Sequence, residues 1–104
     1  MNDIKVAEME TRFDANTAQE AETALTKLVD GGSRKIVCDM SKTEFISSAG
    51  LRVLLSVAKQ LQKLNGKIIL CSLKPPVQKV FEMAGFTRIF ETYGSEEEAL
   101  KSLK

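Results

Sequence analysis

The chain has 104 residues, of which 43% are hydrophobic and 28% are charged, and its formal net charge is +1. This length suits one domain over residues 1–104, and the near-neutral charge argues against direct nucleic-acid binding, since such binders concentrate Lys and Arg. The sequence has no histidine, which excludes Ser-His-Asp and Cys-His catalysis and every metal site built on histidine.

A short strand followed by an amphipathic helix is predicted at the start of the chain. Apolar residues recur through residues 4–9, although the pattern there is weak. Thr17 and Glu20 have the spacing of a capping box, and apolar residues follow at helical intervals. The helix is expected to end at Gly31-Gly32, because glycine is common just after a C-cap.

A buried strand and a second helix are predicted in the middle of the chain. Residues 35–40 form a short apolar and β-branched run that is typical of a strand covered on both faces. Residues 41–46 are expected to form a loop, and the leucine-rich stripe over residues 51–64 predicts a helix. Asn65-Gly66 closes that helix.

The last third of the chain repeats the alternation. Residues 67–72 have the same buried-strand pattern, and Pro75-Pro76 begins a helix that Gly85 ends. A brief strand is expected over residues 88–91. Ser95 and Glu98 form a second capping box, which predicts a C-terminal helix. Alternation of strands and helices predicts an α/β protein with a mostly parallel sheet.

Residues 39–51 carry the most information about function. They run from the end of a predicted strand, through a polar loop, to the start of the second helix. One of Ser47 and Ser48 is expected to be the N-cap, but a cap needs only one hydroxyl. The small pair Ala49-Gly50 leaves the helix start unshielded, so a partner backbone or a phosphate could approach it. From the residues alone, a purely structural role and a docking or modification site stay equally open.

The sequence DMSKTEFISSAGL at residues 39–51 resembles the signature of STAS domains of the anti-sigma factor antagonist family. That signature reads Asp-Leu-Ser, a few residues, an apolar residue, and then Asp-Ser-Ser/Thr/Ala-Gly-Leu. The likeness covers nearly the whole chain, including residues 12–18, 65–73 and 77–90. It implies a STAS fold with a mostly parallel mixed sheet of about four strands and about four helices.

The resemblance also implies a binding switch without catalysis. In the family, the serine before the small residue and glycine, here Ser48, is phosphorylated by an anti-sigma factor that is also a serine kinase. The unphosphorylated protein binds the anti-sigma factor and so releases a sigma factor, and a PP2C-type phosphatase restores that form. No cofactor, metal or catalytic residue is implied. Partner contacts of the family map onto Asp14, Ser41, Ser47, Ser48, Ala49, Gly50 and Arg52.

Two features depart from the family pattern. Ser47 stands where the family usually has Asp, so a negative charge beside the acceptor is lost and Ser47 becomes an alternative phosphorylation site. The family usually begins with a two-strand hairpin, for which only residues 4–9 are available. An uncovered sheet edge can pair with a second copy, and homodimerisation is a hypothesis on that ground.

Two other functions compete with the switch. The chain could be a STAS scaffold subunit of a signalling or transport complex that is not phosphorylated. It could also be a hydrolytic or nucleotide-binding enzyme that uses Ser48. The missing histidine and the lack of a glycine-rich phosphate loop argue against an enzyme.

Several residues near the motif have plainer explanations. Asp39 and Ser41 are interpreted as turn formers at the end of a strand, with partner contact as the alternative. Met40, Phe45 and Ile46 are interpreted as core or half-buried packing residues.

The two cysteines and the apolar pattern bear on the compartment. Cys38 and Cys71 each lie in an apolar run and are interpreted as reduced core thiols, with a regulatory disulfide as the alternative. No apolar stretch has the length of a membrane span, and no signal-peptide pattern begins the sequence. A cytoplasmic protein is therefore expected.

Overall fold

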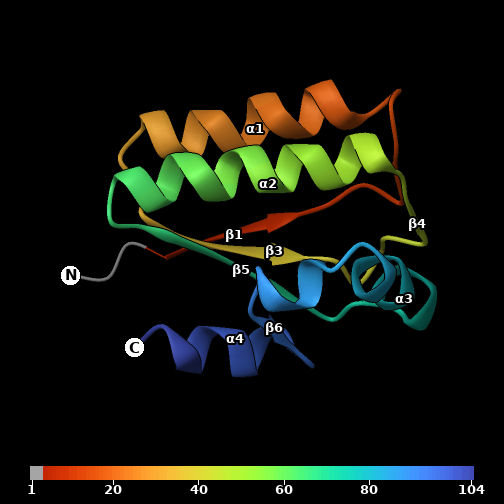
Figure 1. Ribbon diagram of the computed structural model, residues 1–104. Helices are drawn as coiled ribbons and strands as arrows, with labels where there is room; N and C mark the ends of the chain where they lie inside the picture. Colours follow the sequence, from red (N-terminus) through yellow and green to blue (C-terminus); the bar gives the residue numbers. More distant parts are fainter. Residues whose placement is uncertain (1–3) are drawn as a thin grey trace.

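The computed structural model describes residues 4–104 and has a four-stranded parallel sheet with helices on both faces (Figure 1). The sheet order is β1-β3-β5-β6, and each neighbouring pair is parallel. The predicted α/β fold is confirmed. The strands of this sheet are β1 (Ile4–Glu8), β3 (Lys35–Asp39), β5 (Lys67–Cys71) and β6 (Thr92–Tyr93). The helices are α1 (Ala18–Asp30), α2 (Ser48–Lys63), α3 (Pro75–Met83), the short 3-10 helix η1 (Phe86–Arg88) and α4 (Glu96–Ser102).

The central strands β3 and β5 are buried on both faces, which explains their continuous apolar sequences. On one face, the side chains of β3 and β5 pack with Leu25 of α1, Leu54 of α2 and Phe81 of α3 in one core. On the other face, Val37 and Ile69 pack against α4 in a second, smaller core. Figure 1 shows α1 and α2 side by side over one face and α4 against the other.

A second, two-stranded sheet lies at the end of the molecule where α1 and α2 begin. It pairs β2 (Arg12–Phe13) with β4 (Phe45–Ile46) in parallel. The sequence predicts a loop over residues 41–46, because a two-residue strand is too short to show an alternating pattern. This small sheet joins the segment before α1 to the segment before α2.

The capping box predicted at Thr17 is wrong. Thr17 precedes α1, but its backbone has φ −111° and ψ −10°, and its side chain makes no cap hydrogen bond. The Thr17 hydroxyl instead donates to the carbonyl of Arg12 at 2.6 Å and accepts from the backbone N–H of Asp14 at 3.1 Å. These bonds in the turn between β2 and α1 occupy the Thr17 hydroxyl, which a capping box would need for a bond to the helix backbone.

The strand predicted over residues 88–91 is also wrong. Gly85 ends α3 as expected, with a left-handed φ of 76°, but η1 follows it and β6 begins only at Thr92. Phe86 and Phe90 both pack on Phe81, with ring centroids 6.2 and 6.1 Å apart in edge-to-face geometry. In a strand, two residues four positions apart would be about 13 Å apart, too far for both rings to contact one partner, whereas a helical turn brings them together.

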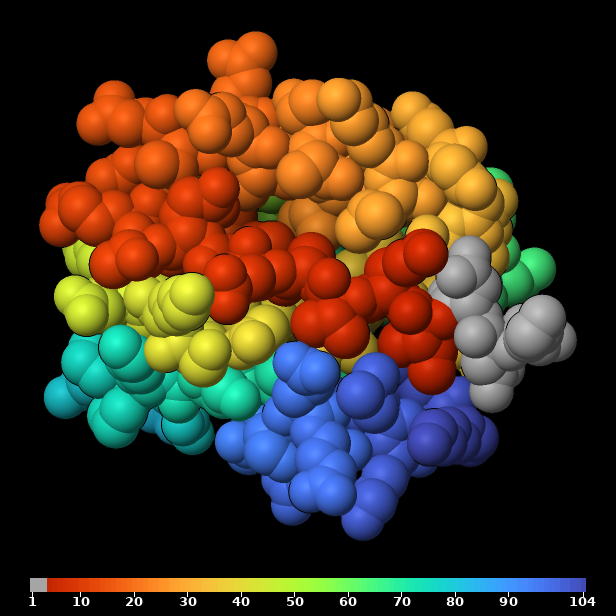
Figure 2. All heavy atoms as spheres, turned by 180° about the vertical axis from the view of Figure 1, so that it is seen from behind, coloured from red at the N-terminus to blue at the C-terminus, as the bar shows by residue number. Residues whose placement is uncertain are grey.

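The β1 strand forms one edge of the main sheet, as the missing hairpin led us to expect. Its one neighbour among residues 4–104 is β3. Figure 2 shows β1 and the segment after it uncovered between α1 and α4. Homodimerisation through this edge stays a prediction, and light scattering that shows only monomer at high concentration would remove it.

The two cysteines face opposite sides of the sheet. Cys38 belongs to the core under α1 and α2, whereas Cys71 belongs to the core under α4. Both are buried free thiols, and burial is the main cause that raises the pKa of each. Because a disulfide needs two side chains that point toward each other, this geometry argues against a regulatory bond within the chain.

Candidate functional site

Ser47 is the N-cap of α2 and is fixed by its own chain. Its backbone is extended, with φ −100° and ψ 176°, and its hydroxyl accepts a hydrogen bond from the backbone N–H of Ala49 at 3.2 Å. Its N–H donates to the carbonyl of Phe13, and its carbonyl accepts from the N–H of Leu51. Ser47 is therefore bound on both sides, and its hydroxyl has a structural task.

Ser48 is the first residue of α2 and differs from Ser47 in each of these respects. Its side chain is exposed. Its hydroxyl has no hydrogen-bond partner among residues 4–104. The two serines, which the sequence could not tell apart, have separate positions: one closes the helix and the other faces solvent.

Gly50 is buried and explains why a small residue is needed in the first turn of α2. A Cβ atom at this position would lie 2.6 Å from the carbonyl oxygen of Phe13 and 2.9 Å from Cγ1 of Ile46. The absent side chain therefore makes room for the chain's own small sheet. The sequence analysis expected this space to admit a partner, and the structure fills it with β2.

Asp14 lies in the turn between β2 and α1. Its side chain is 16% exposed, and one carboxylate oxygen accepts from the backbone N–H of Asn16 at 3.0 Å. The other carboxylate oxygen lies 3.4 Å from Nε of Arg12. Asp14 thus shapes the turn and holds Arg12.

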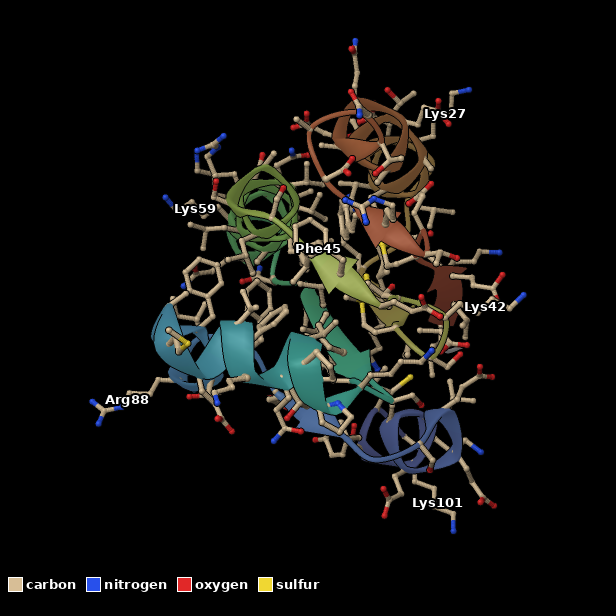
Figure 3. The ribbon with its side chains drawn as sticks, turned by 90° about the vertical axis from the view of Figure 1, so that its right-hand side faces the viewer. Lys27, Lys42, Phe45, Lys59, Arg88 and Lys101 are labelled. Carbon is tan, nitrogen blue, oxygen red and sulfur yellow. The ribbon has the colours of Figure 1, made fainter. Side chains whose placement is uncertain are left out.

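An exposed aromatic ring and a cation lie next to the start of α2. The guanidinium of Arg12 is stacked 4.8 Å from the centre of the Phe45 ring. Phe45 is 42% exposed, and Figure 3 shows it beside the start of α2. Our interpretation of Phe45 as a packing residue is wrong, whereas Met40 and Ile46 are buried as expected.

Sequence reasoning missed the pair of Arg12 and Phe45 because its register is set by the small sheet. Arg12 and Phe45 are directly paired residues of β2 and β4. Those strands have two residues each, and no sequence pattern reveals them. The Phe45 side chain is left outside because Ile46, its neighbour, points into the core.

The loop before β4 is held by polar contacts. The carboxylate of Asp39 accepts from the backbone N–H of Ser41 at 2.9 Å. This hydrogen bond agrees with the interpretation of both residues as turn formers. Ser41 itself is exposed. Thr43, which the sequence analysis did not single out, is fully buried and donates its hydroxyl to the carbonyl of Glu10 at 2.8 Å.

The helix that begins at this site has an unusual charge. It contains no acidic residue, and its first turn has no acid to interact with the positive end of the helix dipole. Its three cations are Arg52, Lys59 and Lys63. Arg52 is exposed one turn after Ser48, on the same face of the helix.

Residues 4–104 contain neither a candidate metal centre nor a candidate membrane span. No group of three or more His, Cys, Asp or Glu residues between positions 4 and 104 could hold a metal ion. In the same part of the chain, none of the helices has both the length and the apolar character that a membrane span requires.

Comparison with known proteins gives a consistent family. The sequence profile of the STAS domain matches residues 2–99. BtrV of Bordetella bronchiseptica, a candidate anti-sigma factor antagonist, is 47% identical over 87 residues, which cover 84% of this chain and 75% of BtrV.

Solved structures agree in fold. An anti-sigma factor antagonist from Mycobacterium paratuberculosis superposes with a TM-score of 0.88 at 23% identity, over 99% of this chain and 87% of its own. The Bacillus cell fate determinant SpoIIAA in its phosphorylated form superposes with a TM-score of 0.77 at 20% identity, over 100% and 94% of the two chains. At these identities the structures show the fold alone. Together with the profile and the similarity to BtrV, they lead to one conclusion: the chain is a STAS domain protein of the anti-sigma factor antagonist family.

Proposed function

We propose that this protein binds an anti-sigma factor while Ser48 is unphosphorylated and releases it when Ser48 is phosphorylated. In this function the protein acts in the cytoplasm by binding and catalyses no reaction itself. The kinase is the anti-sigma factor, and a PP2C-type phosphatase restores the binding form. The observation that carries the proposal is the hydroxyl of Ser48 at the first position of α2, which is exposed and has no hydrogen-bond partner among the described residues.

Accessibility separates the two candidate serines. A kinase must bring a γ-phosphoryl group to the hydroxyl oxygen, and the Ser48 side chain is exposed. The Ser47 oxygen is occupied by the N–H of Ala49. Phosphorylation of Ser47 would modify the oxygen that caps α2, whereas phosphorylation of Ser48 leaves that oxygen unchanged. These differences favour Ser48.

The start of α2 can accept a phosphate without unfolding. Phosphorylation adds about −1.5 to −2 charges, and the free N–H groups and dipole of a helix start favour an anion. The first turn has no acidic side chain that would repel the phosphate. The fold is therefore expected to persist after modification.

The surface around Ser48 is where a partner would detect the phosphate. Of the expected contact residues, Asp14, Ser41, Ser47, Ser48, Ala49 and Arg52 are at least partly exposed. Gly50 is buried beneath them and supports the surface from inside. A partner that fits a neutral hydroxyl would face a dianion, and misplaced charge at an interface costs several kcal/mol, or more than a hundredfold in affinity.

The relatives support this proposal in two ways. BtrV, at 47% identity, is itself a candidate anti-sigma factor antagonist. SpoIIAA, which shares the fold, has been solved in a phosphorylated form.

The direct test is phosphorylation by the proposed partner, an anti-sigma factor kinase of the native host. The purified protein is incubated with that kinase and ATP, and the modified position is mapped by mass spectrometry. We expect one phosphate on the wild type, the same on Ser47→Ala, and none on Ser48→Ala. Ser95→Ala, which changes a serine at another helix start, is the matched control and should be labelled.

Binding completes the test. Ser48→Asp should lose affinity for the anti-sigma factor, while Ser48→Ala should keep it. If the protein takes up no phosphate and Ser48→Asp binds the partner like the wild type, the switch is rejected and the scaffold function takes its place.

A further inference from the structure

We propose that the outer face of α2 is a docking surface for an acidic protein surface on the partner, and we call Arg52, Lys59 and Lys63 the basic face. This inference deepens the proposed function, because it specifies the partner's chemistry and extends the contact surface beyond the helix start. Lys59 and Lys63 lie outside the contacts that the family resemblance implies.

Helix geometry places these cations in a row. At about 100° and 1.5 Å per residue, Arg52, Lys59 and Lys63 fall within an arc of about 60° that also includes Ser48. The row is about 16 Å long from Arg52 to Lys63. Figure 3 shows Lys59 projecting from α2 away from the sheet. The basic face thus begins one turn after the hydroxyl that the switch modifies.

The cations of the basic face have no acidic partner in the part of the protein that the structure describes. None of the three makes an ion pair with a residue between 4 and 104. Some lysines outside α2 are paired: Lys42 lies 3.3 Å from Glu8, and Lys67 lies 2.7 Å from Glu91. The free charges of α2 are available to a partner.

The basic face lines an open groove between α1 and α2. The groove has a volume of about 540 Å³, and Leu55 and Ser56 form part of its floor. Glu22 of α1 lies on its opposite wall. Acidic side chains laid along the α2 wall of the groove could contact all three cations, whereas a carboxylate placed against α1 would be repelled by Glu22.

Charge also distinguishes α2 from the neighbouring helix. The neighbouring helix α1 has three acids, Glu20, Glu22 and Asp30, against one lysine. A long polyanion such as nucleic acid would be repelled by these acids on leaving the basic face. A folded partner can confine its acidic residues to the width of one helix, so an acidic protein surface fits better than nucleic acid.

Two variants with equal charge test the proposal. The first removes the three cations of the basic face, by Arg52→Gln, Lys59→Gln and Lys63→Gln. The matched control removes three exposed, unpaired lysines from the other helices, by Lys27→Gln, Lys79→Gln and Lys101→Gln. Because both variants lose three positive charges, any difference between them reports position and not net charge.

The first measurement uses defined probes and needs no natural partner. A helical peptide with one glutamate per turn is titrated into the isotope-labelled protein, and backbone amide shifts are followed by NMR. We expect shifts concentrated at residues 48–63, weakened by salt and lost in the basic-face variant. Shifts spread equally over all exposed lysines would overturn the proposal. So would tighter binding of single-stranded DNA of equal charge at the same residues.

The second measurement uses the anti-sigma factor. The basic-face variant should bind it roughly tenfold or more weakly than the wild type, since three ion pairs are lost, and the control should bind like the wild type. Equal binding by both variants would overturn the proposal. If neither the wild type nor the control binds the anti-sigma factor, the proposed function fails, and the peptide titration still decides the fate of the basic face.

Discussion

The starts of α2 and α4 use the same cap but treat the helix dipole in opposite ways. In α2 the hydroxyl of Ser47 accepts from a backbone N–H two residues later, and in α4 the hydroxyl of Ser95 accepts from the N–H of Glu98, each at 3.2 Å. The first turn of α4 then has three acids, at residues 96–98, whereas the first turn of α2 has none. The acids of α4 interact with the positive end of its helix dipole. The start of α2 has no such acid and can accept an anion.

The third position of each helix shows the same contrast. In α4, the carboxylate of Glu98 reaches back to accept from the N–H of Gly94 at 3.1 Å, one residue before the partner that a standard capping box would choose. In α2, the third position is Gly50, which lies against the carbonyl of Phe13. The first turn of α4 is thus bonded by side chains of its own segment. The first turn of α2 packs at Gly50 against β2, and Ser48 stays exposed.

The largest expected effect comes from filling the space at Gly50. Gly50→Ala would place a methyl group 2.6 Å from the Phe13 carbonyl oxygen, which no side-chain rotation can relieve. We expect the free energy of unfolding to fall by about 1–3 kcal/mol, the usual cost of overpacking, despite the better helix propensity of alanine. Urea denaturation measures this change.

Ser48→Ala is the matched control for Gly50→Ala. It also creates an alanine in the first turn of α2, but at an exposed position, and its stability should stay within about 0.5 kcal/mol of the wild type. If Gly50→Ala is as stable as this control, the small sheet does not press on α2 and the account of Gly50 is wrong.

The next effect separates capping serines from the exposed one. Ser47→Ala and Ser95→Ala should each lower the free energy of unfolding by about 1 kcal/mol, because each leaves a backbone N–H without its cap. Thermal or chemical unfolding of the two variants and of Ser48→Ala gives the comparison. A loss for Ser48→Ala as large as that for Ser47→Ala would contradict the assignment of the cap.

These variants mark the boundary of what the sequence could predict. The spacing of Ser95 and Glu98 predicted a cap that exists, because the Ser95 hydroxyl accepts from the N–H of Glu98. The same spacing at Thr17 failed, because the Thr17 hydroxyl closes a turn to Arg12. Local patterns predict local bonds until another segment of the chain offers a closer partner.

The sequence predicted the position of the site, but not which serine caps the helix and which is exposed. The motif located the helix start, and Ser47 and Ser48 were both candidates. Which of them caps depends on the extended backbone at Ser47, which the small sheet holds through the carbonyl of Phe13. That sheet pairs residues more than thirty positions apart, so no local pattern could reveal it or the stacking of Arg12 on Phe45.

A smaller effect tests the open dipole of α2. Ser48→Glu would place the first acid in that turn, and we expect it to stabilise the protein by about 0.3–1 kcal/mol. Arg52, one turn further on, adds an ion pair of similar kind. In α4, Glu96→Gln should cost less than Ser48→Glu gains, because two other acids remain. Urea denaturation at low salt compares the two.

Salt and Arg52 sharpen this prediction. The gain from Ser48→Glu should shrink in high salt, which screens exposed charges. It should also shrink when Arg52→Gln is added, whereas adding Lys79→Gln on α3 should leave it unchanged. A gain that neither salt nor Arg52 affects would mean that helix propensity, and not charge, is responsible.

The smallest effect concerns Glu91, an acid outside both helix starts. Its contribution to the free energy of unfolding gives a reference value for an exposed carboxylate in this protein. Glu91 accepts from Lys67 Nζ at 2.7 Å and from the Tyr93 hydroxyl at 2.8 Å. The hydrogen bond from Lys67 is the main cause that lowers the pKa of Glu91 and raises that of Lys67. Both side chains are about half exposed, so the pair should contribute only a few tenths of a kcal/mol.

The direction of its pH dependence follows from the sign of the Glu91 shift. Because the folded pKa is lowered, the stabilisation is present above the unfolded pKa of Glu, and it is lost as the pH falls through the folded value. The stability difference between the wild type and Glu91→Gln should therefore be positive at neutral pH and shrink in acid, below the ordinary range for Glu. A difference that stays constant on acidification would show that the carboxylate is not held by its charge. Glu91 could then not serve as the reference for the gain expected from an acid at the start of α2.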